Sequence, residues 1–423
     1  YLAAKYGGGI FLLIYILLAL TFGYTMIVAE SALGRMTRKS PVGAFKAFGK
    51  KAGWLSFGGW INAIIPVLIV PYYSVIGGWV IKYLIEYVKG NGTKLAADGY
   101  FSEFISNGAS TEICFVIFCL FTLSIIYAGV RNGIERVSKF MMPILVVLSV
   151  IIAIYSVTRP GAIEGVKYFL VPNLKNFSWM TVVAAMGQMF YSLSIAMGIL
   201  ITFGSYMKKD SSIEDSTRNV EVFDTAIAIM AGLMIIPAVF AFSGGDPDTL
   251  QAGPALMFIT IPKVFANMGF GTVVGILFFL LVLFAAVTSS IALTESAVST
   301  FEDEIGWSRR KSTVVIGIIM IALGTLSCLG YGPLAFVKII GMQFLDFFDF
   351  LTNSVMMPIA AMMISIFVSK VVGIDRIEEE IRHGEAAFRR KKIFVVMIKY
   401  LCPIFAMIIL ASSVANAFGW ISM

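Results

Sequence analysis

Ten long apolar runs constrain this chain more than any other feature of its sequence. A helical run of about 20 apolar residues matches the thickness of a bilayer's hydrocarbon core. Backbone amides cannot stay unpaired in lipid, so each run is expected to be a helix, and the alternating pattern of barrel strands is absent. The expected spans lie near residues 10–33, 54–88, 112–129, 137–157, 179–206, 222–243, 270–300, 313–331, 343–372 and 393–418.

Composition leads to the same fold class. Hydrophobic residues make up 59 % of the 423 residues, and charged residues make up only 13 %. That charged share is roughly half of the share in ordinary globular proteins. A soluble enzyme, a nucleic-acid-binding protein and a disordered scaffold are therefore poor interpretations. The sequence predicts an all-α polytopic membrane protein whose surroundings are a lipid bilayer.

The loops between the runs predict an orientation. Most of the 32 Lys and Arg residues lie in alternate loops, and the last of these loops ends in Arg389-Arg390-Lys391-Lys392. Loops rich in Lys and Arg stay on the cytoplasmic side, which explains the net charge of +7 without nucleic acid. We therefore expect a multi-pass protein of the inner (plasma) membrane with both ends of this chain outside. The sequence does not indicate an oligomeric state.

Residues suited to metal or covalent chemistry are scarce. The four cysteines all lie in apolar runs without a CxxC pair, and the single histidine, His383, lies in a charged loop. These cysteines are typical of buried apolar thiols rather than of a metal or redox site. An intramembrane hydrolase would need a nucleophile with a base or a metal motif, and neither occurs in the sequence. We expect no catalytic residues and no enzyme activity.

Five ionisable residues lie within the apolar runs: Glu30, Asp224, Glu295, Asp346 and Asp349. Charged groups in a membrane are costly, so such residues indicate either function or hydrogen bonding that fixes helix packing. Both interpretations stay open for all five on this evidence.

Two polar segments indicate an ion or ligand site. Residues 284–290 (FAAVTSS) offer hydroxyl and backbone oxygens, which are ligands that a hard cation prefers, although such hydroxyls also bond to the preceding helical turn. The run 179–206 has small and polar residues in its middle. Such a helix can unwind and expose backbone groups, or it can simply pack closely against a neighbour. These residues are Gly187, Gln188, Ser192, Ser194 and Gly198.

Several ordered motifs carry a resemblance along essentially the whole chain. They are YGGGIFLLIY with ESALGR, the pair Tyr72-Tyr73, RNGIERVSKFMMP, GQMFYSLSIAMG, DTAIAIMAGLMIIPAVFAF, FITIP, FAAVTSSIAL and FEDE. On these motifs the chain resembles the neurotransmitter:sodium symporters, in particular the prokaryotic branch with the bacterial leucine and multi-hydrophobic amino-acid transporters. The resemblance implies two inverted five-helix repeats and one extra C-terminal helix. Residues 1–157 would be the remainder of the first repeat. Residues 158–372 would be the second repeat with an outer lid loop at 244–269, and 373–423 an inner amphipathic loop and the last span.

The resemblance also implies site residues. Two sodium ions are expected, the first at Ser192 and Asp224, and the second at Ala285, Thr288 and Ser289. Asp224 would supply a fixed negative charge near Gln188, so no chloride requirement is expected. Glu30 would support the unwound part of the broken helix, and Phe190 and Asp349 would belong to an outer gate. Tyr73 would bind the substrate carboxylate in a pocket lined by Ile69, Tyr73, Phe190, Tyr191, Ser194, Met197, Ser289 and Leu293.

One departure bears on function. In the family a further broken helix precedes the motif that begins here at Tyr1, and it completes both ion sites, the substrate site and the outer gate. Ten spans are expected here without that helix, so residues 1–423 alone are expected to show no sodium-driven uptake. The resemblance implies a sodium-coupled symporter that imports hydrophobic or neutral amino acids by alternating access. A proton-coupled amino-acid transporter, and a non-transporting sensor or scaffold on the same fold, are the alternatives.

Overall fold

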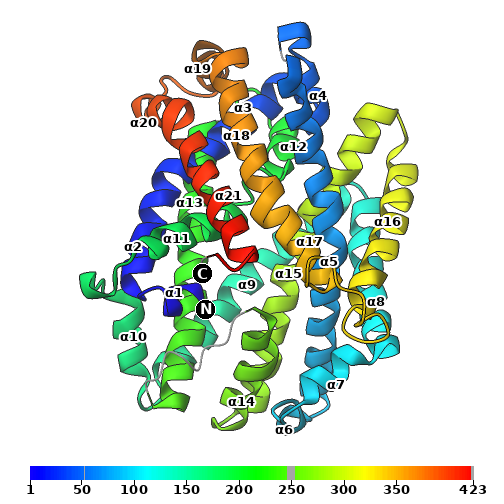
Figure 1. The fold of residues 1–423 in the computed structure, drawn as a ribbon, viewed down its shortest axis with the longest axis vertical. Helices are drawn as coiled ribbons and strands as arrows, with labels where there is room; N and C mark the ends of the chain where they lie inside the picture. The colour runs from blue at the N-terminus through cyan, green and yellow to red at the C-terminus, as the bar shows by residue number, and fades with distance from the viewer. Residues whose placement is uncertain (52, 245–252, 421–423) are drawn as a thin grey trace.

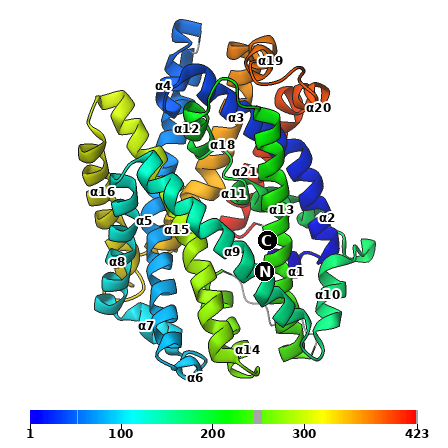
Figure 2. The same cartoon turned by 180° about the vertical axis from the view of Figure 1, so that it is seen from behind.

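The computed structural model describes residues 1–51, 53–244 and 253–420, and these form a bundle of helices that run mainly along its long axis (Figures 1 and 2). Nine segments of the described residues are long and apolar enough to cross a membrane, and they coincide with nine of the ten predicted runs. The nine are Gly9–Thr37 (α2, Gly9–Leu18; α3, Tyr24–Thr37), Gly53–Val88 (α5, Phe57–Val88), Gly108–Tyr127 (α8), Val130–Val157 (α9, Arg136–Val157), Ile213–Ser243 (α13), Gly271–Ile305 (α15), Arg309–Leu329 (α16), Phe344–Val372 (α17, Phe344–Asp349; α18, Met357–Phe367) and Lys391–Ala417 (α20, Lys391–Val396; α21, Cys402–Ala417).

The tenth predicted run, 179–206, forms two short helices instead of one span. They are α11 (Trp179–Ser192) and α12 (Ile199–Tyr206). The remaining helices are short and lie between or beside the spans. They are α1 (Leu2–Lys5), α4 (Pro41–Lys46), α6 (Gly92–Leu95), α7 (Tyr100–Ser106), α10 (Ala162–Leu170), α14 (Ile261–Ala266) and α19 (Ile374–Arg382).

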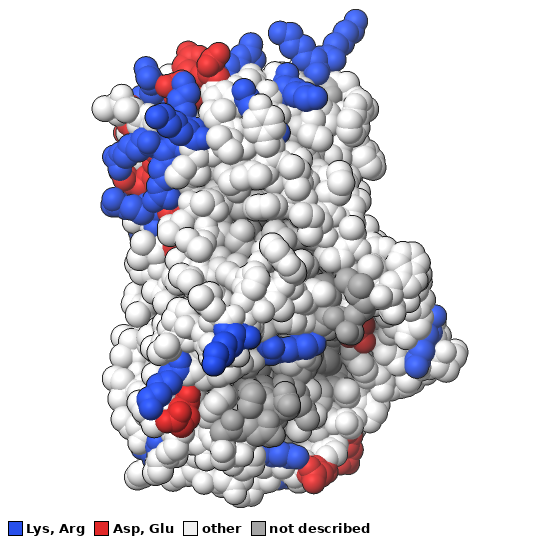
Figure 3. All heavy atoms as spheres, turned by 60° about the vertical axis from the view of Figure 1, so that its left-hand side comes forward, with Lys and Arg blue, Asp and Glu red and all other residues white. Residues whose placement is uncertain are grey.

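Charged side chains divide the molecule along its long axis. Figure 3 shows Lys and Arg gathered at the upper end, where Figure 1 places α4, α19 and α20, above a middle zone that is almost free of charge. We call this upper end the basic end. An uncharged zone of this kind suits the hydrocarbon core of a bilayer, where charges are costly. The positive-inside rule predicts that the basic end is cytoplasmic.

The long helices α5 and α15 pack against each other through the centre of the bundle, with α8 and α16 beside α5. At the end away from the basic loops, aromatic side chains join these helices to the shorter segments. The Tyr83 hydroxyl donates to the backbone oxygen of Phe258 at 2.8 Å, and the rings of Tyr83 and Phe258 lie 4.9 Å apart. This contact holds the segment Leu256–Ala266, which includes α14, against α5. The predicted lid loop 244–269 is described only in part, because residues 245–252 lie outside the described residues.

At the basic end, a buried ion pair joins α3 to α19. Arg35 and Glu380 lie 345 residues apart in sequence, yet Arg35 Nε is 2.6 Å from Glu380 Oε1. The Arg35 side chain is fully buried, and that of Glu380 is 7 % exposed. The segment 375–392, expected to be a solvated surface helix, therefore buries one face, including Ile377 and Ile381. The repeat boundaries at 157 and 372 stay predictions.

Replacing Arg35 with Gln should lower the free energy of unfolding by about 3–5 kcal/mol, because it leaves the Glu380 carboxylate buried and uncompensated. Titration with a denaturing detergent in mixed micelles, followed by helical circular dichroism, measures the change. Lys139→Gln is the matched control, because the side chains of its pair with Glu135 are 75 % and 50 % exposed. Exposed pairs contribute about 0–1 kcal/mol. Equal losses in the two variants would contradict the assignment.

Candidate functional site

The interruption between α11 and α12 lies inside the bundle and frees backbone groups there. The α11 helix begins at a reciprocal cap, in which the Ser178 hydroxyl accepts from the Thr181 amide at 3.1 Å. It ends at Ser192, and residues 193–198 do not continue it. Ser194, Ala196 and Gly198 adopt positive φ angles of 54°, 58° and 72°. Positive φ is unusual for Ser and Ala, so the surrounding structure must hold this backbone in place.

A buried carboxylate on α3 meets the unwound backbone. The Ala196 amide donates to Glu30 Oε1 at 2.8 Å, and Glu30 is fully buried. The other carboxylate oxygen, Oε2, has no hydrogen-bond partner among the described residues. The helices α3 and α12 approach closely, since a Cβ on Gly34 would lie 2.0 Å from the Ile201 backbone oxygen. Glu30 therefore pairs an amide that the interruption would otherwise leave without a partner.

A cavity of about 440 Å³ opens beside this segment. Seven of the eight residues predicted for the substrate pocket line it, together with the predicted ion residues Ser192 and Thr288 and with Gln188. The remaining wall comes from Met142, Ile199 and Ala292. The seven are Ile69, Tyr73, Tyr191, Ser194, Met197, Ser289 and Leu293.

Phe190, predicted for the substrate pocket, is not among the described residues that line the 440 Å³ cavity, and its role in an outer gate stays a prediction. Phe190 is 2 % exposed, and its ring lies 5.1 Å from that of Phe22 on the first span, Gly9–Thr37. Its neighbour Tyr191 instead lines the 440 Å³ cavity and two further cavities that also touch Asp349. Consecutive helical residues point about 100° apart, so only one of the two aromatic rings can face the cavity.

Three oxygen-bearing side chains converge at the end of α11. The Ser192 hydroxyl donates to Asp224 Oδ1 at 2.5 Å, and the Tyr15 hydroxyl donates to Asp224 Oδ2 at 2.5 Å. The carboxylate thus joins α11, α13 and α2. Hydroxyl and carboxylate oxygens suit a hard cation. Gln188 and Tyr15 both line a second, larger cavity of about 890 Å³.

A second group of oxygens lies on α15. The Thr288 hydroxyl lies 3.0 Å from the backbone oxygen of Ala285 and 3.0 Å from that of Phe284, one turn earlier. Ser289 is exposed to the cavity, whereas Ser290 is buried against Thr122 at 3.3 Å. The structure therefore brings Ala285, Thr288 and Ser289 together and turns the third hydroxyl of the triplet away.

Asp349 lies on the other side of Tyr191, in a small polar cluster. Its Oδ1 accepts from Asn353 Nδ2 at 2.5 Å and from the Tyr72 hydroxyl at 3.2 Å. Asp349, Gln188 and Tyr191 all line a cavity of about 890 Å³, which is separate from the 440 Å³ cavity. Asp346 contacts the Tyr331 hydroxyl at 3.1 Å instead, so the two aspartates do not act as a pair.

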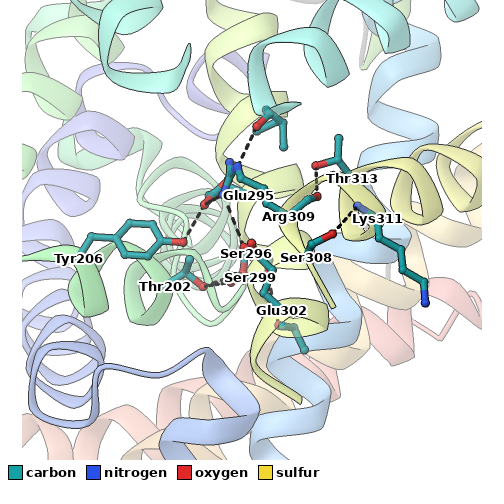
Figure 4. Close-up of polar contacts among 12 residues, drawn as sticks. Thr202, Tyr206, Glu295, Ser296, Ser299, Glu302, Ser308, Arg309, Lys311 and Thr313 are labelled. Atoms are coloured by element: carbon teal, nitrogen blue, oxygen red, sulfur yellow. Dashed lines mark hydrogen bonds and ion pairs between the residues drawn. The ribbon is translucent and has the colours of Figure 1, made fainter. Parts of the chain in front are cut away.

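Glu295 has a role in packing near the basic end. Figure 4 shows it between Tyr206 and Arg309. Arg309 binds both of its oxygens, at 3.0 and 2.5 Å, and the Tyr206 hydroxyl donates to it at 2.7 Å. A bidentate arginine is the strongest partner that a buried carboxylate can have. Through Tyr206, Glu295 and Arg309, the helix α12 that follows the interruption is joined to α15 and α16.

Sequence reasoning missed several residues of this site. Tyr15, Tyr72, Met142 and Asn353 all contact a predicted site residue or line a cavity with one. Asn353 follows Asp349 by four residues, a spacing that places two side chains on one helical face. That signal was present in the sequence. Tyr15 lies 209 residues from Asp224, and local spacing does not indicate that contact.

Comparison with known proteins gives one consistent result. The sodium:neurotransmitter symporter family model matches residues 1–96 and 100–419. The uncharacterised sodium-dependent transporter YhdH of Bacillus subtilis (strain 168) is 34 % identical over 390 residues, which cover 92 % of this chain and 85 % of the relative. An uncharacterised sodium-dependent transporter of Haemophilus influenzae (strain Rd) is 30 % identical over 428 residues, which cover 98 % and 92 %.

The fold has a counterpart among solved structures. The crystal structure of MhsT in complex with L-phenylalanine is similar with a TM-score of 0.87 and 34 % identity, over 98 % of this chain and 93 % of that one. The likeness thus extends over the whole bundle, and the inverted-repeat transporter fold expected from the motifs is confirmed. The family is one of transporters and not of enzymes. This chain belongs to the sodium:neurotransmitter symporter family.

Proposed function

We propose that the full-length protein imports hydrophobic amino acids by sodium-coupled symport and alternating access. One observation carries the proposal: the 440 Å³ cavity beside the interrupted helix has Ser192 of one oxygen group and Thr288 and Ser289 of the other on its wall. A substrate in the cavity would therefore lie next to both ions. The structure of MhsT with L-phenylalanine supports this reading, since MhsT is similar along nearly the whole chain.

The lining of the cavity supports an apolar substrate side chain. Ile69, Met197 and Leu293 supply much of the wall, and none of the described lining residues carries a formal charge. Burying an unpaired charge in such a wall would be costly. The hydroxyls of Tyr73 and Ser194 offer donors for the polar end of an amino acid. Met197 is flexible and can adapt to side chains of different shapes.

The oxygen groups support sodium as the coupled ion. Asp224 with Ser192 offers a charged site, and Ala285 with Thr288 and Ser289 offers a neutral one. Ser289 belongs both to the neutral site and to the substrate wall, so an ion that orients its hydroxyl also shapes the pocket. Shared residues of this kind couple the two binding events, and each would raise the affinity for the other.

The interrupted helix supports alternating access. Its two halves have different partners: α11 meets Tyr15 and Asp224 through Ser192, while α12 is tied to Glu295 and Arg309 through Tyr206. The unwound segment between them can absorb a change in angle without breaking a continuous helix. Access from either side would then depend on which set of contacts is released.

The first prediction for this function concerns sodium. Thr288→Ala with Ser289→Ala should raise the sodium concentration needed for half-maximal substrate binding by at least tenfold, because two oxygens leave the ion's shell. Scintillation proximity binding with a radiolabelled hydrophobic amino acid across a sodium titration measures this. Ser290→Ala is the matched control, since that hydroxyl faces Thr122 and not the cavity. Unchanged sodium dependence in the double variant would contradict the assignment, and binding driven by pH alone would favour proton coupling.

The second prediction concerns the substrate. Leucine, methionine, phenylalanine and tryptophan should compete for binding at concentrations at least tenfold lower than lysine or glutamate, because the described cavity wall holds no opposite charge. A competition series against one labelled substrate at fixed sodium gives the ranking. Stronger competition by lysine or glutamate than by leucine would refute an apolar pocket.

The third prediction concerns chloride. Asp224 already places a carboxylate beside Ser192 and Tyr15, so transport should proceed at the same rate when gluconate replaces chloride. Uptake by the full-length protein into proteoliposomes at constant sodium tests this. If uptake stops in gluconate, the carboxylate does not serve as the fixed charge of the site.

A further inference from the structure

Between residues 392 and 411 of the last span, the exposed side chains are apolar except at three residues. Along α20 and α21 the side chains of Ile404 and Met407 are 51 % and 60 % exposed, and Ile393, Val396 and Ile408 are exposed as well. A face of this composition within a membrane span meets lipid acyl chains. Lys392, Lys399 and Tyr400 are exposed on the same segment. Lys399 lies within the span, eight residues beyond its first residue.

The three cations directly before Lys392 in the sequence are paired with carboxylates. Lys391 Nζ is 2.5 Å from Glu378 Oε2, a contact that lowers the pKa of that carboxyl, and Arg390 Nη1 is 3.0 Å from Glu221. Lys392 and Lys399 differ, because neither forms an ion pair, a hydrogen bond or a ring contact with any described residue. The Tyr400 hydroxyl likewise has no hydrogen-bond partner within the described ranges. The chain thus leaves two positive charges and one hydroxyl donor on a lipid-facing surface.

Lys392 and Lys399 are both exposed on the same span. Two α-helical turns hold about seven residues, and here the second turn runs into the π-helical segment Met397–Leu401, which contains Lys399. Side chains on a helix lean toward its N-terminus, which for this span is the basic end. A lysine at position 399 is therefore expected to extend toward the membrane surface, on which Lys392 also lies, as lysines near the ends of spans do. Two lysines arranged this way can hold one anionic group between them.

We propose that Lys392 and Lys399 bind the phosphate of an anionic glycerophospholipid, whose acyl chains lie along Val396, Ile404 and Met407. The Tyr400 hydroxyl is positioned to donate to the phosphate or to a glycerol ester oxygen. Charge complementarity selects an anionic headgroup, and the apolar stripe that continues below the lysines selects a molecule with long acyl chains. A symmetric contact with a second copy would instead bring like charges together, which is unfavourable.

Native mass spectrometry of the delipidated, detergent-solubilised protein tests this site with added dioleoylphosphatidylglycerol or dioleoylphosphatidylcholine. The wild type should bind the anionic lipid more tightly than the zwitterionic one. Loss of one lysine in Lys399→Gln should weaken phosphatidylglycerol binding about fivefold, and loss of both in Lys392→Gln with Lys399→Gln about thirtyfold. Phosphatidylcholine binding should not change.

Two control variants distinguish binding at this site from a nonspecific attraction of anionic lipids to surface lysines. Lys208→Gln with Lys209→Gln removes two exposed lysines of the basic end that also lack ion-pair partners among the described residues, and it should leave phosphatidylglycerol binding unchanged. Lys399→Arg keeps the charge and should retain binding. Equal binding of both lipids by the wild type, or wild-type binding by the Lys392/Lys399 double variant, would overturn the proposal. So would a double variant that changes the oligomer mass but not the lipid adducts.

Discussion

The unwound backbone of residues 193–198 is the feature on which the rest of the site depends. Every backbone amide and carbonyl inside a membrane protein needs a partner, because the hydrocarbon offers none. An interruption in a helix is tolerated only where other groups supply those partners. Glu30 does so for the Ala196 amide, from a helix 166 residues earlier in the chain. The same interruption turns Ser192 toward Asp224 and lets Ser194 and Met197 line a cavity.

The two ends of the interrupted helix are held differently. At the basic end, the Glu295–Arg309 pair joins α15 to α16 and the Arg35–Glu380 pair joins α3 to α19, and α12 reaches the first pair through the Tyr206 hydroxyl. At the cavity end, contacts are single hydroxyl-to-carboxylate bonds, such as those that Asp224 receives from Ser192 and Tyr15. Buried ion pairs are costly to break, whereas single hydroxyl bonds exchange readily for an ion or for water. The geometry is therefore stiff on one side of the cavity and adaptable on the other.

Buried charges of this protein have partners within the protein, whereas two exposed lysines on the last span have none among the described residues. Carboxylates and guanidinium groups buried inside the bundle have partners, which is the usual condition for a charge removed from water. The exposed lysines at 392 and 399 do not, although they lie on a face that contacts lipid. In the proposed site their partner is the phosphate of an anionic lipid. The bilayer is thus part of the charge balance of this fold as well as its solvent.

Hydrophobic patterning was enough to predict where the helices run and which polar residues lie within them. Nine of the ten predicted spans are continuous segments, because about 20 apolar residues have one stable arrangement in a bilayer. The motifs also indicated the family. Of the eight residues predicted from them for the pocket, seven line the cavity. The contacts between distant polar groups could be seen only in the fold. Tyr15 meets Asp224, and Tyr206 meets Glu295. The fold also places Tyr191, and not Phe190, beside the cavity. Periodicity fixes the spacing of side chains along one helix, but the rotation of each helix about its own axis depends on neighbours that are distant in sequence.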